Sequence, residues 1–468
     1  MSMKPATLST KSDVHEDVQS FTPYQAVSIS MQDAGTMLKP NSEQLQSTMN
    51  TDPWSYLSVR LPSTLSDMGI THISYGGNFT RTGPADEMAS ADLGQGESQA
   101  IILTGGCSSP HGNQFMENGE NEFFFCAQLS NKAYAFTPTP PKTQFQAWTG
   151  EFKTLADMPR ERTRHATVQV WSEQVCVIGG RDLTDTLIAE IDCYDPIIDY
   201  WTTIGKLPEE YLTSDCAAFS MGNSVYLIGG YGTSYEAKDQ VIVMDVSNLN
   251  DVKFLQGPSL GTKRGDIDVA VLDNEYIYVS GGFTHKDDSK PLNTVEQLTI
   301  GTKTWTPVNA LNEERGGKQL VTLNGKIYAL GGEQRVDANG ITKEEVLDLV
   351  QRVDILDTVE VLDPRKDVHG GKSEWSVSGV MPSSLVRFGA SEWTWGSEGV
   401  IFVFGGQSSF DADCECFRGT DKVMVFDTSK SFQYGESNAA SANPTVKGFA
   451  AYYFIISTLV YYLASPWL

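Results

Sequence analysis

Six short apolar segments, each ending in Gly-Gly, recur along this chain of 468 residues. Their first glycines are separated by 74, 50, 52, 50 and 74 residues, so three steps share a period near fifty and two carry insertions of similar size. Segments rich in Val, Ile, Phe and Tyr suit buried strands, and glycine permits the sharp turn that follows. A lone unit cannot bury its apolar faces, so the period predicts stacked units. We interpret all twelve glycines as structural: Gly105, Gly106, Gly179, Gly180, Gly229, Gly230, Gly281, Gly282, Gly331, Gly332, Gly405 and Gly406.

The remainder of each unit repeats as well. A first strand precedes the doublet, as in residues 162–171 and 265–272, and a third strand follows it, as in 241–246. A fourth strand opens with a large aromatic residue, which we expect to pack between units. Each unit is therefore predicted to contain four antiparallel strands. Tyr194 ends a third strand, whereas Trp201, Trp305 and Trp375 belong to fourth strands, and all four are given this structural role.

This pattern resembles the Kelch repeat over roughly residues 52–429. The resemblance implies an all-β, six-bladed β-propeller with a central channel. The sixth unit lacks a fourth strand, whereas residues 52–62 carry the Trp and the terminal Leu-Pro of the fourth strand at 199–208. We therefore predict that the N-terminal strand closes the ring, with the propeller spanning residues 51–429.

The segments outside the repeats differ in composition. Residues 1–50 are polar and predict a disordered tail, and residues 430–447 predict a polar linker. Residues 449–468 contain no charged side chain, and about twenty apolar residues suffice for a helix that spans a bilayer. We predict a C-terminal transmembrane segment over 448–468 that anchors a cytoplasmic propeller. A buried strand or helix is an alternative interpretation of the same residues. A glycolipid-anchor signal with a cell-surface propeller is the other alternative, although no secretory signal is visible.

Charge and cysteine usage exclude some classes of function. The formal net charge of −25 argues against nucleic-acid binding. The seven cysteines have no framework spacing, and Cys414 and Cys416 are too close and too isolated for a zinc site. We expect no metal and no cofactor, and interpret the cysteines as buried or free thiols in a reducing compartment. A bridge between Cys107 and Cys126 stays open, and Cys176 and Cys193 are interpreted as small apolar strand residues.

Both long insertions, 107–131 and 333–357, fall in second-to-third-strand connections, and 407–421 adds material at the same kind of place. In antiparallel units these connections share a face with the starts of the first strands. Arginines there suit bidentate contacts with carboxylate or phosphate, and in several Kelch propellers the corresponding face binds acidic peptides. We therefore predict a protein partner, or another anionic ligand, at this face. An alternative is that the arginines pair with local acidic residues. The candidate residues are Arg162, His165, Arg264, Arg315 and Arg387.

The sequence offers no catalytic residue that we can name. It contains no nucleophile motif, phosphate loop or metal signature, and Arg352 stands where the iron-dependent Kelch specifier proteins carry histidine in Glu-x3-Asp-x3-His. Residues 343–353 predict a short amphipathic helix instead. The leading hypothesis is a noncatalytic, membrane-anchored scaffold that binds protein. The alternative is a sugar-processing or other small-molecule enzyme, an isomerase or oxidase, that uses the channel mouth.

Overall fold

A computed structural model describes residues 53–76, 97–109, 111–115, 121–143, 146–170, 173–285, 291–334, 353–365, 373–395, 398–411 and 416–428. The chain divides into two compact units, residues 1–50 and 51–468. The predictions for residues 1–50, 430–447 and 448–468 lie outside the described residues, as does the helix expected over 343–353 except for its last residue. All of the described residues therefore belong to the second unit.

Six of the four-stranded antiparallel sheets in this unit form a ring, and we number them as blades 1 to 6. The innermost strands of the six blades are, in order, β2 (Gly69–Gly76), β8 (Ala166–Gln169), β12 (Ala217–Met221), β16 (Asp268–Leu272), β20 (Gln319–Leu323) and β26 (Gly389–Trp395). The second strands are β3 (Glu97–Thr104), β9 (Val175–Ile178), β13 (Ser224–Ile228), β17 (Tyr276–Ser280), β21 (Lys326–Leu330) and β27 (Glu398–Phe404). The third strands are β6 (Ala133–Thr139), β10 (Glu190–Asp195), β14 (Val241–Asp245), β18 (Val295–Thr299), β24 (Thr358–Leu362) and β30 (Lys422–Asp427). The outermost strands are β7 (Thr149–Thr154), β11 (Tyr200–Lys206), β15 (Lys253–Gln256), β19 (Thr306–Val308), β25 (Ser376–Val380) and β1 (Trp54–Arg60).

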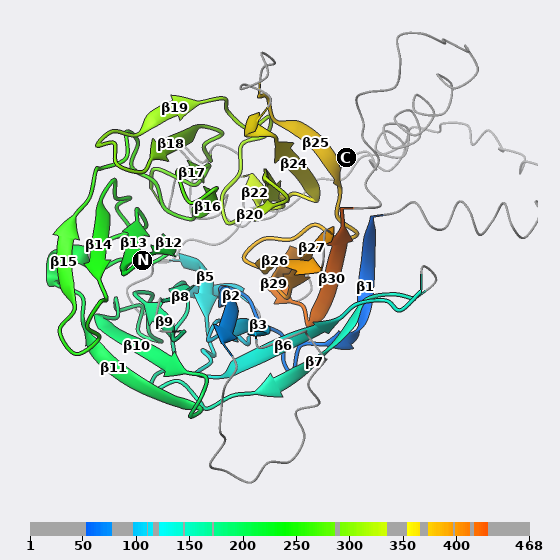
Figure 1. Ribbon diagram of the computed structural model, residues 1–468, viewed down its shortest axis with the longest axis horizontal. Coiled ribbons are helices and arrows are strands. Elements are labelled where there is room, and N and C mark those ends of the chain that lie inside the picture. The colour runs from blue at the N-terminus through cyan, green and yellow to red at the C-terminus, as the bar shows by residue number, and fades with distance from the viewer. Residues whose placement is uncertain are drawn as a thin grey trace, which may run out of the picture. The chain divides into compact units, whose positions relative to one another are not determined.

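The blades form a closed ring. Each innermost strand contacts the innermost strand of the next blade, and β26 of blade 6 contacts β2 of blade 1. Figure 1 shows the six sheets around a common axis. The all-β, six-bladed prediction is thereby confirmed.

The N-terminal strand completes the last blade, as the sequence predicts. β1 pairs antiparallel with β30 and places Trp54 opposite Phe426, with ring centroids 4.8 Å apart. Blade 6 is thus built from both ends of the propeller segment. Ring closure consequently depends on a strand that lies more than three hundred residues from its partner in sequence.

The glycine doublets end the second strands in a conformation that suits glycine. The first glycine of each pair has φ between 52° and 68°, and the second has φ between 83° and 102°. At Gly281, an added Cβ would lie 2.3 Å from the carbonyl oxygen of Arg315 in the next blade. The backbone N–H of Gly282 donates to that same carbonyl at 2.9 Å. The doublet therefore joins neighbouring blades by a direct backbone contact, and a side chain at either glycine would push the two backbones apart.

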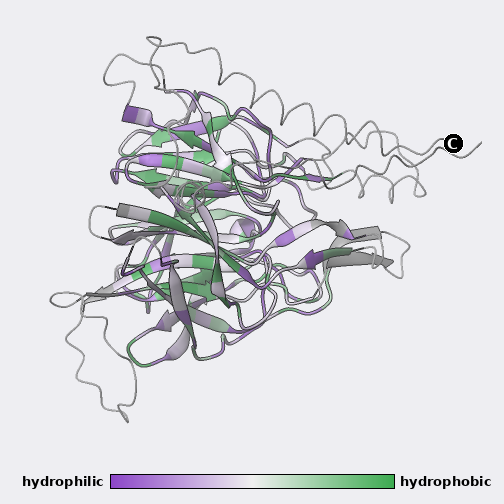
Figure 2. Ribbon diagram, turned by 90° about the vertical axis from the view of Figure 1, so that its right-hand side faces the viewer, coloured by the Kyte–Doolittle hydropathy of each residue, from purple (hydrophilic) through white to green (hydrophobic). Residues whose placement is uncertain are grey.

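Apolar side chains fill the spaces between blades, and Figure 2 shows hydrophobic segments concentrated in the strands. Trp201 is buried in one such cluster, with its ring 5.3 Å from that of Tyr194. The indole N–H groups of Trp201, Trp305 and Trp375 each donate to a backbone carbonyl that follows the outermost strand of the preceding blade. The acceptors are Ala156 at 2.8 Å, Pro258 at 2.8 Å and Asn309 at 3.0 Å.

The insertions of blades 1, 5 and 6 build a further structure on one face. β4 (His111–Phe115) and β5 (Asn121–Cys126) come from blade 1, and β28 (Gln407–Asp411) and β29 (Cys416–Gly419) come from blade 6. These strands form one sheet in the order β28-β29-β4-β5. The blade 5 insertion adds the pair β22 (Glu333–Gln334) and β23 (Asp354–Ile355), and β23 contacts β28. We call these six strands the insertion platform, and its face of the ring the platform face.

The interpretation of the cysteines as thiols is wrong for most of them. Cys107 bonds to Cys126 and Cys176 bonds to Cys193, and Cys416 is also in a disulfide. Cys176 and Cys193 do lie inside strands, but β9 and β10 pair them directly opposite one another. This register was not deduced from the sequence spacing. Among the described cysteines, Cys216 alone is free, and burial raises the pKa of its thiol to about 12.

Candidate functional site

Three of the predicted arginines occupy one equivalent position. Arg162, Arg264 and Arg315 stand just before the innermost strands of blades 2, 4 and 5, and each is 0% exposed. Their Nη1 atoms donate to the carbonyl of the first doublet glycine in the same blade, at 3.1, 2.9 and 2.9 Å respectively. Their Nη2 atoms donate to a carboxylate on the third strand: Asp192 at 2.5 Å, Glu296 at 2.7 Å and Glu360 at 2.7 Å.

The paired carboxylates also hold the loop that enters each blade. Glu296 accepts the backbone N–H groups of Gly261 and Thr262 at 2.6 and 3.1 Å. Glu360 accepts those of Asn312 and Glu313 at 2.7 and 3.1 Å. In blades 4 and 5 the arginine–carboxylate pair thus ties together a doublet, a third strand and an incoming loop, whereas in blade 2 Asp192 contacts the incoming loop through the side chain of Arg160.

This placement gives the three arginines a structural role. Burial lowers the pKa of all three guanidinium groups, to about 10 for Arg162, although the neighbouring carboxylates oppose the shift. Ligand binding by these side chains stays a prediction, and it would require them to leave buried partners. The pairing with local acidic residues, which the sequence left open as the alternative, accounts for their contacts.

Arg387 does not share their position. It lies two residues further along its blade, and Leu385 occupies the place that corresponds to Arg162. The counterpart of Arg387 in blade 2 is Arg164, which the sequence analysis missed. The signal was present in the segment Arg162-Thr-Arg164-His165, where arginine stands at both positions.

A belt of six equivalent residues surrounds the channel axis at this point. Each has a left-handed φ between 49° and 58° and donates its backbone N–H to the carbonyl of its counterpart in the preceding blade. The six N···O distances lie between 2.9 and 3.1 Å, and the sixth bond returns to the first residue. The belt thus closes the ring a second time, independently of β1. Its members are Asp67, Arg164, Asp215, Asp266, Gly317 and Arg387.

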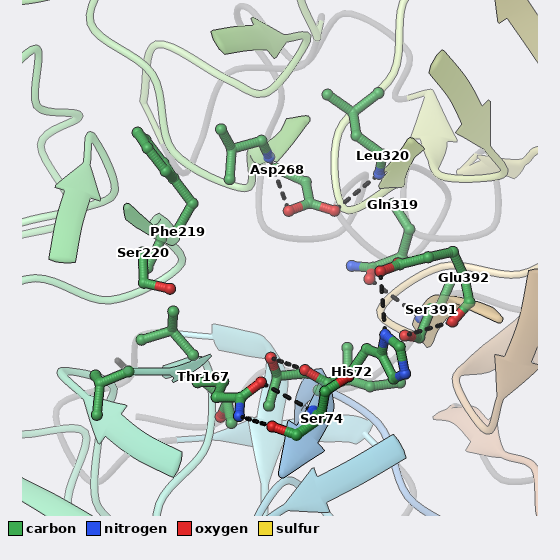
Figure 3. Close-up of a pocket in the computed structure, with 18 of the residues that line it drawn as sticks. His72, Ser74, Thr167, Phe219, Ser220, Asp268, Gln319, Leu320, Ser391 and Glu392 are labelled. Carbon is green, nitrogen blue, oxygen red and sulfur yellow. Dashed lines mark hydrogen bonds and ion pairs between the residues drawn. The ribbon is translucent and has the colours of Figure 1, made fainter. Parts of the chain in front are cut away.

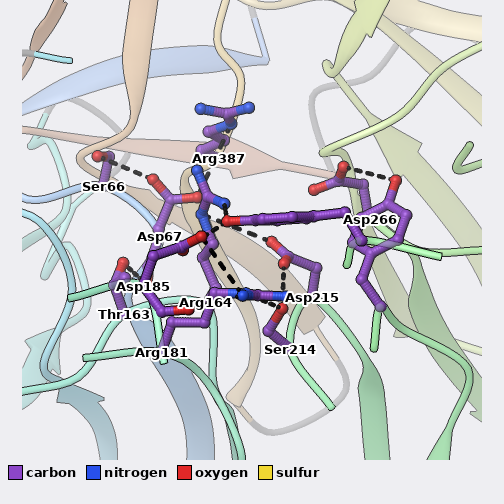
Figure 4. Close-up of polar contacts among 12 residues, drawn as sticks. Ser66, Asp67, Thr163, Arg164, Arg181, Asp185, Ser214, Asp215, Asp266 and Arg387 are labelled. Atoms are coloured by element: carbon purple, nitrogen blue, oxygen red, sulfur yellow. Dashed lines mark hydrogen bonds and ion pairs between the residues drawn. The ribbon is translucent and has the colours of Figure 1, made fainter. Parts of the chain in front are cut away.

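The charged side chains of the belt gather in one cluster (Figure 4). The Nε atoms of Arg387 and Arg164 lie 3.8 Å from carboxylate oxygens of Asp67 and Asp215, respectively. Burial raises the pKa of Asp67 despite the opposing effect of Arg387 and Arg164. For Arg164, burial acts to lower the pKa, but the surrounding acidic groups outweigh it and raise the pKa well above its usual value.

Two tyrosines from the second-to-third connection of blade 3 complete the cluster. Tyr231 donates its hydroxyl to Asp266 at 3.1 Å. Tyr235 accepts from Arg164 at 3.1 Å and donates to Asp185 at 2.5 Å, while the guanidinium of Arg181 lies 3.8 Å from its ring centroid. The charged and hydroxyl groups of this cluster pair with one another through ion pairs and hydrogen bonds. Such a network can close the channel at the platform face.

His165 lies inside the protein beside blade 1. Its side chain is buried, and its Nε2 lies 2.9 Å from the hydroxyl of Thr104. Burial holds the pKa of His165 well below its usual value, so the imidazole is neutral near pH 7. It does not join the other four predicted residues in one ligand site.

The innermost strands enclose a central cavity of about 700 Å³ (Figure 3). His72 and Glu392 meet on its wall, with Nδ1 and Oε1 3.6 Å apart, and the His72 ring lies 5.4 Å from that of Trp393. Asp268 accepts the backbone N–H groups of Val269 and Leu320, both at 2.8 Å. Burial raises the pKa of Asp268. None of these residues was among the predicted ligand residues, although the place of His72 in a first strand pointed to the channel.

Comparison with known proteins identifies the repeat. A family model of the Kelch motif matches residues 269–312, which contain blade 4 from β16 to the loop after β19. The chain is a Kelch-repeat β-propeller. Its doublets, interblade tryptophans and ring closure are therefore features of a Kelch propeller with six blades.

Several Kelch proteins are similar to this propeller. Alpha-scruin of Limulus polyphemus is 26% identical over 226 residues, covering 46% of this chain and 24% of alpha-scruin. Kelch-like protein 35 of Homo sapiens is 27% identical over 300 residues, covering 57% and 46%. Kelch repeat protein M-T8 of Myxoma virus (strain Lausanne) is 26% identical over 255 residues, covering 54% and 43%. The chain thus spans less than half of the length of each relative.

Among solved structures, one titled "Structure of YjhT" aligns to 79% of this chain and 96% of its own. The TM-score is 0.49 and the sequence identity is 11%, a likeness too low to carry an argument.

The described part of the Kelch propeller contains no group of three or more His, Cys, Asp or Glu side chains placed to hold a metal ion. Within the same residues, no helix has the length and apolar character needed to cross a membrane. Two features of the described residues are placed to meet a ligand: the platform face and the polar cavity at the centre of the ring.

Proposed function

We propose that this Kelch propeller is a noncatalytic scaffold that binds a protein partner on the platform face. One observation carries the proposal: insertions from three consecutive blades pair into a common structure instead of standing as separate loops. A platform of this kind presents backbone and side chains from distant parts of the sequence on a rigid base, which suits the recognition of a folded or extended segment. Kelch propellers are typical protein-interaction scaffolds.

A loop exchange tests this surface. The connection of blade 1, residues 107–132, would be replaced by the short connection of blade 3, residues 231–240, which joins equivalent strands. Partners cross-linked in cells to the unmodified chain would be identified, and binding of the purified partner would be measured for both proteins. We expect the exchange to abolish binding while the propeller still melts cooperatively.

A control belongs on the opposite face. Ile197 and Ile198 are 51% and 66% exposed in the turn between β10 and β11, and serine at both positions should leave partner binding unchanged. Loss of binding in this variant, with binding retained after the loop exchange, would contradict the proposal.

The anionic character of the partner is a finer proposal. Of the five predicted ligand residues, Arg387 has the largest exposed fraction, 8%, whereas three of the others have none. The partner would therefore meet Arg387 at the rim of the belt rather than all four arginines. An Asp- and Glu-rich peptide should bind more tightly than its Asn and Gln counterpart, and equal binding of the two peptides would rule out an acidic segment as ligand.

We also propose that the chain is held at a membrane through residues 449–468, on the strength of their composition. Five of the six described cysteines are in disulfides, which supports an oxidising compartment and so favours the cell-surface alternative over a cytoplasmic propeller. Carbonate extraction with protease protection of intact cells tests both points. A propeller that is protected from external protease would contradict the cell-surface location, and release by carbonate would contradict the anchor.

A further inference from the structure

We propose that the central cavity binds a small organic cation that carries several hydroxyl groups, as an amino sugar does. The proposal is independent of the scaffold function. It rests on where the cavity opens, on the sign of the charges on its wall and on the polar groups that surround it.

The cavity is separated from the platform face. Its wall begins two or three residues after the belt, at Ile70, Thr167, Asp268 and their counterparts, and within the described residues no belt member lines it. At the other end the wall includes Glu173 and Gly222, which lie in the turns between first and second strands. A ligand would therefore enter from the face opposite the platform, and a partner on the platform would not block it.

The charges on the wall have one sign. Glu173, Asp268 and Glu392 line the cavity, while none of the described lining residues is Lys or Arg. Lys318 is buried behind the wall, where its Nζ donates to the carbonyl of Ser280 at 2.6 Å and its charge opposes that of Asp268, so the negative charge of the wall rests mainly on Glu173 and Glu392. Carboxylates at the edge of a partly enclosed space attract a cation more strongly than they would in bulk water. The wall thus selects for positive charge and against a carboxylate or phosphate.

Neutral polar groups lie around the same space. Ser74, Ser220 and Ser391 contribute hydroxyl groups from three different blades, and Figure 3 shows them around the cavity with His72 and Glu392. A ligand with several hydroxyl groups can satisfy such a wall, because each hydroxyl both donates and accepts.

The cavity also has an apolar side and a suitable size. Phe219 lines it and is held by a parallel stack with Tyr226, with ring centroids 4.6 Å apart and planes 5° apart. Phe219 is only 7% exposed, because it packs in the apolar cluster between blades 3 and 4, so it closes this side of the cavity without presenting an open face to a ligand. The volume of about 700 Å³ falls within the range of roughly 300–1,000 Å³ of small-molecule sites.

Three matched sugars test the proposal on the full chain. Glucosamine, glucose and glucuronate have similar shapes and carry positive, zero and negative charge at neutral pH. We expect glucosamine to bind in a saturable manner by calorimetry or saturation-transfer NMR, glucose to bind about tenfold more weakly, and glucuronate not to bind. Tighter binding of glucuronate, equal binding of all three, or no saturable binding of glucosamine would each overturn the proposal.

A charge-removing variant locates the site. E392Q keeps the shape of the wall residue and should weaken glucosamine binding about tenfold. E374Q alters an exposed glutamate outside the cavity and should leave the affinity unchanged. Equal affinities in E392Q and E374Q would overturn the proposed site, and if E392Q fails to fold, the three-sugar series decides alone. Glucosamine binding should also survive the loop exchange on the platform, which separates this proposal from the scaffold function.

Discussion

Arg264 illustrates how a charged residue becomes part of the core of this propeller. Its guanidinium has no exposed surface, yet every donor group except Nε has a partner in the same blade. A buried ion pair of this kind adds little net stability relative to an apolar pair, but the loss of one partner leaves the other charge uncompensated. Removal of Arg264 should therefore destabilise the fold mainly because the buried carboxylate of Glu296 would lose its opposite charge.

We expect R264M to lower the free energy of unfolding by about 3–5 kcal/mol, because Glu296 would stay buried without its cation. Urea denaturation followed by tryptophan fluorescence would measure this. R365M is the matched control: Arg365 is 53% exposed and its Nε lies 3.5 Å from Asp363. Loss of this surface pair should cost less than about 1 kcal/mol, and equal costs for the two variants would contradict the structural role of Arg264.

His165 makes stability depend on pH. Burial depresses its pKa in the folded protein, whereas the unfolded chain titrates near its ordinary value of about 6.5. Below that pH the unfolded chain binds a proton that the folded chain does not, so stability falls as pH falls, by up to about 1.4 kcal/mol per pH unit.

The variant H165Q should therefore lose less stability than the unmodified protein when the pH is lowered from 6.5 to 5. Thermal melts of both proteins across this interval provide the measurement. Parallel stability curves for the two proteins would show that His165 is not the titrating group.

At the scale of the strand, register decides which side chains meet. β9 and β10 place Cys176 opposite Cys193, and their disulfide links the second and third strands of blade 2 across a separation of 17 residues. A bond of this loop length restricts the unfolded chain, which raises the stability of the blade.

Alanine at both Cys176 and Cys193 should lower the free energy of unfolding by about 2–4 kcal/mol, measured by denaturation under non-reducing conditions. C216A is the control, because Cys216 is a free, buried cysteine in the next blade and its replacement removes a thiol without removing a bridge. Peptide mapping without reductant should recover residues 176 and 193 in one linked species. Recovery of the two cysteines as alkylated thiols would contradict the disulfide.

At the scale of the whole molecule, the ring is held closed by two devices. The outer one is the pairing of β1 with β30, and the inner one is the belt of six backbone hydrogen bonds. Because every blade contacts two neighbours, opening the ring at blade 6 affects the apolar cluster that Trp54 and Phe426 share with blade 5. The propeller is therefore expected to unfold as one unit.

Deletion of residues 1–62 should expose β30 as an edge strand and cause self-association, because unpaired backbone groups at a sheet edge pair with other chains. Size-exclusion chromatography with light scattering would detect this, and a peptide of residues 51–62 added in trans should reduce it. Deletion of residues 1–50 alone is the control and should leave the oligomeric state of the protein unchanged. A monomeric, fully stable protein without β1 would show that the belt suffices for closure.

Much of the fold could be predicted because each repeat is defined by short sequence patterns. The doublets mark the ends of the second strands, Trp201 and Trp305 mark the fourth strands, and Trp54 identifies the missing strand of blade 6. The candidate site was harder to predict. Arg387 was grouped with Arg162 because both stand near the start of a first strand. Arg387 lies two residues further along its blade, which places it in the belt, whereas Arg162 forms a buried ion pair with Asp192.

The sequence alone determined the number of blades, the order of their strands and the segment that closes the ring, because each depends on patterns that recur within about fifty residues. The tertiary structure alone decided the cysteine partners, the joining of the insertions into a platform and the belt around the channel. These features arise where different blades or paired strands meet, and such contacts depend on strand register and on the left-handed backbone at the belt, neither of which residue spacing reveals.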